Sequence, residues 1–212
     1  VLARTSILIT PAMACREWEG VQGQPKFRLG FPQLDAYIDG GMSDGQVAII
    51  LAKTNVGKTI HLLNMLHLSS QEQPDAAYLF CSLEQTRGDW FERARRIWNF
   101  YNLGCDPEDV HKETERYWKD RIRLTDLNRM TEDQLLGAID DFIEQMGKPP
   151  DLVAVDYLGY WAHGFPAADR YAKTTEAVMS LKAIAKDRRT KIWVPHQVNR
   201  TASFGTEPDV DN

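Results

Sequence analysis

The sequence has no long hydrophobic run. Among its 212 residues, no stretch reaches the roughly 18–20 apolar residues that a membrane-spanning helix requires, so we expect no membrane partner. The first residues carry neither an initiator Met nor the layout of a signal peptide. We therefore expect a fragment or a processed chain that works in the cytoplasm: in the nucleoid or, for a viral protein, in the host cytoplasm.

Cysteine and histidine are too few and too scattered to predict a metal site. The three cysteines, Cys15, Cys81 and Cys105, are widely spaced, and the five histidines show no ligand spacing. We expect the cysteines to be reduced and to pack as small apolar residues. Basic residues are outnumbered, 25 against 30 acidic ones, and the net charge is −5. Any contact with nucleic acid would therefore come from a local patch.

The most informative segment that is present reads Ala-Lys-Thr-Asn-Val-Gly-Lys-Thr. It matches the Walker A pattern of a phosphate-binding loop, with Ala in place of the usual first Gly. Such a loop wraps its backbone N–H groups around the β-phosphate of a nucleotide. The residues predicted to bind the nucleotide are Ala52, Lys53, Thr54, Asn55, Val56, Gly57, Lys58 and Thr59.

Individual roles follow from the pattern. Gly57 has no Cβ and lets the main chain approach the ligand. Lys58 is predicted to reach the β- and γ-phosphates, and Thr59 to offer its hydroxyl to Mg²⁺. An apolar run at 46–51 precedes the loop and a helix start at 60–68 follows it, which places the positive end of a helix beneath the phosphates.

Strand-like and helix-like segments alternate from residue 27 onwards, which predicts an α/β fold with a mostly parallel sheet flanked by helices. The predicted strands are 47–51, 77–82, 122–124, 152–156 and 191–194. A capping box at 131–134 begins one helix, an apolar stripe at 177–185 marks another, and 106–119 is a polar helical insertion. Residues 1–25 are predicted to be an arm or linker, with room for a short helix around 13–18, ahead of a domain at 26–212.

Polar side chains follow three of the predicted strands. Asp156 ends an apolar strand, where a carboxylate would face a ligand and act as a second Mg²⁺ partner, although an Asp turn after a strand is common. Glu84 is placed to polarise an attacking water or, equally, to begin a helix. Gln197 could hydrogen-bond a γ-phosphate, but a Gln after a strand indicates little by itself.

Together these segments resemble a known family. The segment 29–35, Leu-Gly-Phe-Pro-Gln-Leu-Asp, with glycines at 40, 41 and 45, resembles the opening signature of RecA-like ATPases. Four further motifs resemble the motor domain of DnaB-type replicative helicases, in the same order and at similar spacing over about residues 27–211. They are Ser-Leu-Glu at 82–84, Val-Asp-Tyr-Leu at 155–158, Leu-Lys-Ala-Ile-Ala-Lys at 181–186 and Gln-Val-Asn-Arg at 197–200.

The resemblance implies a RecA-like P-loop NTPase fold and an ATP-hydrolysing DNA helicase. It implies that Glu84 is the catalytic base and Gln197 the γ-phosphate sensor, beside Lys58, with Thr59 and Asp156 at the metal. The family implies ATP and Mg²⁺ as cofactors and a homo-hexameric ring that moves along single-stranded DNA, hydrolysing ATP between subunits. A primase or a helicase loader would be a further partner.

The sequence departs from the family pattern in places. His196 stands where the family more often has Ser, which leaves open whether it shares the sensor role. Pro195 lacks a backbone donor, so we expect a strand end or a bulge there. The family's arginine finger, DNA-binding loops and later strands would follow residue 212, so we expect a domain that is incomplete at its C-terminus.

Two basic clusters have open interpretations. The first comprises Arg87, Arg93, Arg95 and Arg96, interleaved with aromatic residues, and the second comprises Lys186, Arg188, Arg189 and Lys191. Either could contact DNA. The first could equally serve a subunit interface or simple solvation, and the second could complement a helix dipole. The alternative function is a RecA-like ATPase that does not unwind DNA, such as a recombinase, a helicase loader, a clock-type switch or an ATP-dependent assembly module.

Overall fold

One parallel sheet forms the centre of the computed structural model, which describes residues 10–21, 23, 26–53, 55–125, 127–166 and 169–197. Within these residues the strands are β1 (Val47–Ala52), β2 (Tyr78–Ser82), β3 (Ile122–Thr125), β4 (Leu152–Asp156) and β5 (Ile192–Gln197). Their order across the sheet is β1-β5-β4-β2-β3, and every pair is parallel. The predicted α/β fold with a mostly parallel sheet is therefore confirmed.

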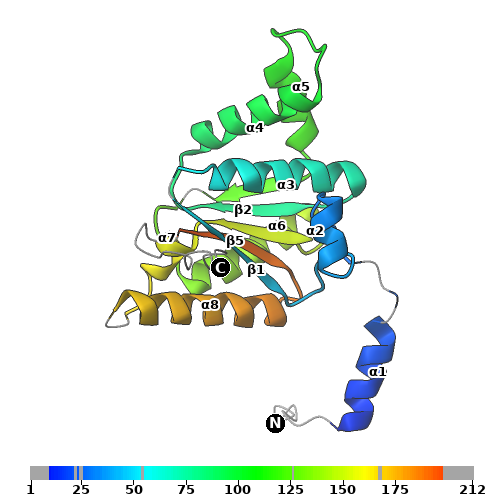
Figure 1. Ribbon diagram of the computed structural model, residues 1–212, viewed down its shortest axis with the longest axis vertical. Helices are drawn as coiled ribbons and strands as arrows, with labels where there is room; N and C mark the ends of the chain where they lie inside the picture. The colour runs from blue at the N-terminus through cyan, green and yellow to red at the C-terminus, as the bar shows by residue number, and fades with distance from the viewer. Residues whose placement is uncertain are drawn as a thin grey trace, which may run out of the picture.

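Helices cover both faces of the sheet (Figure 1). One face carries α3 (Lys58–Glu72), α4 (Arg87–Tyr101) and α5 (Val110–Trp118), and the other carries α6 (Glu132–Met146), α7 (Leu158–Ala162) and α8 (Arg170–Asp187). A short helix, α2 (Pro32–Tyr37), precedes β1. None of the helices in the described part of the chain combines the length and hydropathy needed to cross a bilayer.

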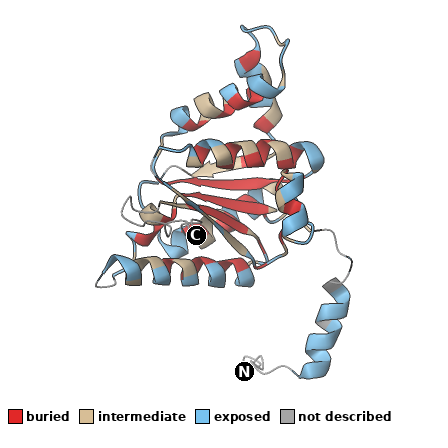
Figure 2. Cartoon of the chain, viewed as in Figure 1, coloured by how far each residue is buried: buried red, intermediate tan, exposed pale blue. Residues whose placement is uncertain are grey.

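The core lies in two layers, one on each side of the strands. In β4, Leu152 and Ala154 pack with α3, α4 and α5, whereas Val153 and Val155 pack with α6, α7 and α8. Every residue of β2 and β4 is buried, so these strands are the inner layer of the molecule (Figure 2). Continuous apolar strands are the expected consequence of a sheet covered on both faces.

The helix starts follow the local sequence signals. Thr131 caps α6 and exchanges hydrogen bonds with Gln134, which confirms the predicted capping box. Thr86 and Asp89 make a second capping box at the start of α4. The predicted polar insertion at 106–119 contains α5, which buries Trp118 against the sheet layer.

The segment that opens the domain has a structural role. Gly30 has a φ of 78°, and a Cβ there would lie 2.5 Å from the Leu68 side chain on α3. The buried Asp35 carboxylate accepts a hydrogen bond from the Leu29 amide at 2.7 Å. The glycine therefore lets the chain lie directly against α3, and the aspartate holds it there.

Helix α1 (Pro11–Val21) is longer than the short helix expected around 13–18. Its described side chains are all exposed (Figure 2). Residues 1–9 lie outside the described residues. The assignment of 1–25 to an arm or linker, and of the domain to 26–212, stays a prediction.

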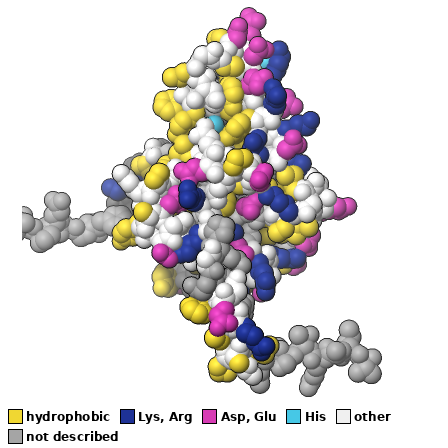
Figure 3. Space-filling model, turned by 90° about the vertical axis from the view of Figure 1, so that its right-hand side faces the viewer, with side chains coloured by type: hydrophobic (Ala, Val, Ile, Leu, Met, Phe, Trp, Pro, Cys, Tyr) yellow, Lys and Arg dark blue, Asp and Glu magenta, His cyan; other side chains and the backbone are white. Residues whose placement is uncertain are grey.

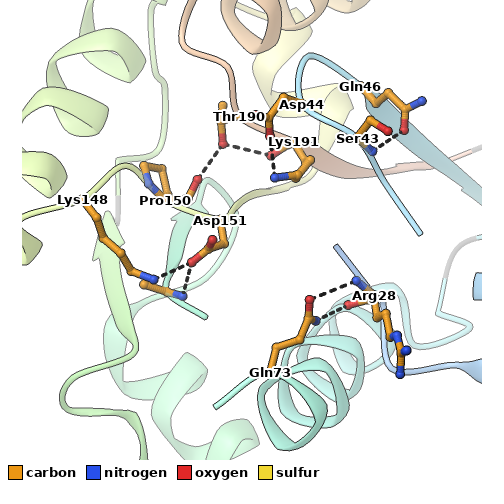
Figure 4. A network of polar contacts seen from close by, with 11 residues as sticks. Arg28, Ser43, Asp44, Gln46, Gln73, Lys148, Pro150, Asp151, Thr190 and Lys191 are labelled. Carbon is orange, nitrogen blue, oxygen red and sulfur yellow. Dashed lines mark hydrogen bonds and ion pairs between the residues drawn. The ribbon is translucent and has the colours of Figure 1, made fainter. Parts of the chain in front are cut away.

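Polar side chains join the amino ends of four neighbouring strands (Figure 4). Ahead of β4, Asp151 accepts hydrogen bonds at 2.8 Å from the Ala77 amide, just before β2, and from Lys148. Thr190, ahead of β5, donates to the Pro150 carbonyl at 2.9 Å. Lys191 pairs with Asp44, which precedes β1. This amino-end lock fixes one end of the sheet and leaves the carboxyl ends available to a ligand.

Pro195 lies inside β5, so the expectation of a strand end or bulge at this residue is wrong. The strand continues to Gln197 in register with β1. Its pairing with β4, however, stops at Trp193. The Ile192 amide donates toward β1 and the Lys191 carbonyl accepts from β4, so by alternation the ring nitrogen of Pro195 faces the β4 side. The missing donor thus falls where there is no partner strand left to receive it.

His67 of α3 is enclosed by aromatic rings. It is fully buried and stacks on Tyr101 with ring centroids 4.7 Å apart, while Tyr117 and Trp118 close its other sides. Its Nε2 lies 3.1 Å from the amide nitrogen of Gln71, and Nδ1 has no described partner. Burial lowers the pKa of His67 to about 4, so the ring is neutral at pH 7.

Acidification should therefore destabilise the fold through this residue. As the pH falls below about 6.5, the unfolded histidine takes up a proton that the folded one refuses until about pH 4. Between pH 7 and pH 5 the free energy of unfolding should fall by about 2 kcal/mol more in the wild type than in His67→Phe, measured by urea denaturation. His111→Gln, which replaces an exposed histidine of α5, is the control. Equal slopes for the wild type and His67→Phe would contradict this.

Candidate functional site

The predicted phosphate-binding loop connects β1 to α3. Gly57 is the N-cap of α3 with φ 89° and ψ 32°, a left-handed conformation that glycine adopts without strain. Asn55 also has a positive φ, and Thr54 lies outside the described residues. None of the described side chains caps α3, and its first turn holds no acidic residue. Its first amides therefore have no capping side chain among the described residues and are available to an anion.

Two side chains that the sequence assigned to the metal lie in contact. The Thr59 hydroxyl, in the first turn of α3, donates a hydrogen bond of 2.7 Å to Oδ2 of Asp156 at the end of β4. Gln85, in the loop after β2, donates to the same hydroxyl at 3.3 Å. Asp156 is 1% exposed, and its Oδ1 has no hydrogen-bond partner in the described residues. Oδ1 of the buried Asp156 carboxylate is therefore available to a ligand at this site.

Neighbouring groups shift the pKa of Asp156 in opposite directions. Burial raises the pKa of the carboxyl, the hydrogen bond from Thr59 lowers it, and the charge of Glu84 raises it again. The cations Arg93 and Lys58 lower it to a smaller extent. A buried carboxylate with a spare oxygen beside a hydroxyl is a donor set that a hard cation accepts.

The side chains at this site fit Mg²⁺, which needs few protein ligands, better than a metal that is coordinated by protein side chains alone. In the described part of the chain, no three His, Cys, Asp or Glu side chains gather into a metal-binding group. Mg²⁺ usually takes one or two protein oxygens and completes its shell with water and substrate phosphate oxygens. Thr59 and Asp156 are the residues that would hold it here.

Glu84 lies in the loop between β2 and α4, and its side chain is exposed. The helix begins after Thr86, and the acid of its first turn is Asp89, so the interpretation of Glu84 as a helix-starting acid is wrong. Ser82 donates to the Gln85 carbonyl at 2.7 Å and fixes this turn. Glu84 raises the pKa of both Asp156 and Tyr157, which places its charge at the same end of the sheet as the loop.

Gln197 ends β5, directly opposite Ala52 in the register with β1. That register brings it beside the first residue of the phosphate-binding loop. His196 faces Leu51, and burial, followed by the charges of Arg170 and Lys58, lowers its pKa. Residues 198–200, the remainder of the Gln-Val-Asn-Arg motif, lie outside the described residues.

Three residues that the sequence analysis did not assign also reach this site. Gln85 contacts Thr59, and the ring of Tyr157 has its centroid 5.5 Å from Lys58 Nζ. Gln85 and Tyr157 each follow a predicted site residue directly, and Tyr157 also lies in the Val-Asp-Tyr-Leu motif. The third residue is Arg93, a member of the first basic cluster, and its charge lowers the pKa of Asp156.

The basic clusters divide into paired and site-facing residues. Arg95 and Arg96 both bond Glu92, with their Nε atoms 2.8 Å from its carboxylate. In the second cluster, Arg188 bonds Asp140 through both guanidinium NH groups. Basic and acidic side chains are also interspersed on the face shown in Figure 3. With the pair between Lys191 and Asp44, four of the eight cluster residues are balanced by a local acidic partner.

The sequence matches a known protein family over most of its length. The family described as the DnaB-like helicase C-terminal domain matches residues 27–207. The chain belongs to this family. No curated protein matches it.

Solved structures support the fold of this DnaB-like domain. The ATPase domain of G40P gives a TM-score of 0.68 at 17% identity, covering 92% of this chain and 73% of that one. A DnaB-like replicative helicase, solved in a study of its interactions with primase, gives a TM-score of 0.71 at 18% identity. That match covers 95% of this chain and 52% of the other, so the present chain spans about half of it. The architecture is that of RecA-like DnaB helicase domains.

Replacing Asp156 with Asn should stabilise the ligand-free domain. The change removes a buried charge and keeps an oxygen for the Thr59 hydrogen bond. A gain of ~1 kcal/mol would raise Tm by roughly 2–4 °C in a chain of this size. We expect this rise at pH 8 with EDTA. Because burial raises the pKa of this carboxyl, the gain should shrink as the pH falls and the wild-type carboxyl takes up a proton. Asp141→Asn, exposed on α6, is the control, and a lower Tm for Asp156→Asn at pH 8 would refute the argument.

Proposed function

We propose that this DnaB-like domain is the ATP-hydrolysing motor of a replicative DNA helicase. The contact between Thr59 and Asp156 carries the proposal. A hydroxyl that follows a phosphate-binding loop and a carboxylate at the end of β4 meet at 2.7 Å, although 97 positions separate them in the sequence. Together with the family match over 27–207, this supports a site for Mg²⁺ and ATP at the carboxyl end of the sheet.

Binding would use the loop and the start of α3. The first amides of α3 face the phosphates, and Lys58 reaches the β- and γ-phosphate oxygens. Thr59 and Asp156 hold the metal side of the nucleotide. Mg²⁺, when bound, neutralises charge that develops on the β- and γ-phosphates.

Hydrolysis would use the loop after β2 and the end of β5. Glu84 accepts a proton from a water molecule as the water oxygen attacks the γ-phosphorus, and the bond to the β,γ-bridging oxygen breaks to release ADP and phosphate. The exposure of Glu84 leaves its carboxylate open to such a water. Gln197, level with Ala52, is placed for its amide to hydrogen-bond the γ-phosphate and to lose that bond after hydrolysis.

In this proposal the domain works in a homo-hexameric ring that hydrolyses ATP between subunits and moves along single-stranded DNA in the cytoplasm. The family match and the helicase neighbour support this assignment. A primase or a helicase loader would be a further partner, and the neighbour was solved in a study of its interactions with primase.

A second candidate is a RecA-like ATPase that does not unwind DNA. The pairing of Arg95 and Arg96 with Glu92, and of Arg188 with Asp140, favours it. Those cations are already engaged, so DNA contact would need other residues. A recombinase, a helicase loader and an ATP-dependent assembly switch all belong to this class.

The site assignment predicts different losses for two variants. Glu84→Gln should lower ATP turnover by at least about 100-fold while ATP binding stays within a few-fold of wild type, because the base is lost and the phosphate contacts remain. Lys58→Ala should lose turnover together with ATP binding. Turnover by phosphate release and binding by calorimetry would check both. Glu132→Gln, exposed on α6, is the matched control. Tight ATP binding with full turnover in Glu84→Gln would remove Glu84 from the mechanism.

Stimulation by DNA separates the two candidate functions. If the domain is a helicase motor, ATP turnover by the full-length protein in low salt should rise several-fold with single-stranded DNA and less with blunt duplex. Low salt is needed because phosphate contacts weaken steeply as salt increases. Turnover that ignores single-stranded DNA at every salt concentration would favour the second candidate and leave the ATP site in place.

A further inference from the structure

The ring of Tyr157 lies between the phosphate-binding loop and α7. On one side, Lys58 Nζ is 5.5 Å from the ring centroid. Tyr160 meets the ring edge-to-face, with centroids 5.1 Å apart and planes at 84°. A Cβ on Gly159 would lie 2.5 Å from Cε2 of the ring. The position of the ring therefore depends on the absence of a side chain at residue 159.

Lys58 needs such a neighbour when the site holds no nucleotide. Asp156 and Glu84 are the nearby anions, yet no described carboxylate lies within ion-pair distance of the Lys58 ammonium. A direct pair with either acid would occupy a carboxylate that the metal or the water requires. An aromatic face attracts the ammonium without neutralising it.

We propose that Tyr157 is a positioning residue that holds the Lys58 ammonium against its ring, both before and after a phosphate binds, and that Gly159 makes room for the ring. The inference rests on the proposed function, since it needs nucleotide binding at Lys58. The ring places the ammonium ahead of binding and so reduces the ordering that binding requires. A cation–π contact at a partly exposed site corresponds to about a three- to tenfold change in affinity.

The structure also provides space for a displaced ring. Tyr157 lines a cavity of about 460 Å³ together with His196, Arg170 and Lys173. A methyl group at residue 159 would push the ring off its present place, and the cavity can receive it without unfolding of α7. Gly159→Ala therefore moves the ring while leaving its chemistry unchanged.

The test is the affinity of a fluorescent ATP analogue, mant-ATP with Mg²⁺, for the whole chain and its variants. Tyr157→Phe should bind within twofold of wild type, because the ring remains. Tyr157→Leu and Gly159→Ala should each bind about three- to tenfold more weakly. At saturating ATP their kcat should stay within about twofold of wild type, because the bound phosphates hold Lys58 in place once every site is occupied. Tyr37→Leu, at an exposed position of α2, is the matched control.

A fluorinated series separates electrostatics from packing. Phenylalanines with one, two and three fluorines at position 157 keep the shape of the ring and weaken its attraction for a cation, so affinity should fall stepwise. A flat series, with wild-type binding intact and Lys58→Ala deficient, would overturn the role of Tyr157 and leave the proposed function standing. Failure of the wild type to bind the analogue, or equal binding by Lys58→Ala, would overturn the proposed function itself. The series also decides the matter if Tyr157→Leu fails to fold.

Discussion

The position of β5 between β1 and β4 is the constraint on which the site depends. It separates the strand that enters the phosphate-binding loop from the strand that ends in Asp156. β5 stays paired with β1 along its whole length but with β4 only through Trp193, so the strands part toward their carboxyl ends. Thr59 reaches Asp156 across this parting. The predicted loop, the carboxylate of Asp156 and the amide of Gln197 therefore lie at the same end of the sheet, although none is close to another in the sequence.

The site holds groups of both signs of charge, which a nucleotide and its cation would neutralise. Asp156 is buried with an unused oxygen, and burial raises its pKa. Lys58 rests over a ring, and the first amides of α3 point away from their helix. The unused carboxylate oxygen and the uncapped amides cost stability in the ligand-free domain, whereas the ring holds Lys58 in place, and all three would favour a bound anion–cation pair. These features thus prepare the domain for its proposed ligand.

Local patterns predicted the strands, the loop and the capping box, because each depends on residues close together in the chain. The resemblance to the DnaB family added the order of the motifs, and the family match over residues 27–207 confirmed the family. What the sequence did not predict depends on contacts across the fold. Glu92 divides one arginine cluster into paired and site-facing members, and the early end of the β4 ladder makes Pro195 acceptable inside a strand. The use of Tyr157 required the position of its ring relative to Lys58.

The amino-end lock has a mechanical consequence. Asp151, Thr190 and Lys191 fix the four neighbouring strands at one end, whereas the proposed nucleotide site lies at the other. A strand of five or six residues is a lever of roughly 17–20 Å. Rotation by only ~5° about the fixed end would then shift the far end by about 1.5 Å, half the length of a hydrogen bond. Small pivots at a rigid base are therefore enough to make or break phosphate contacts.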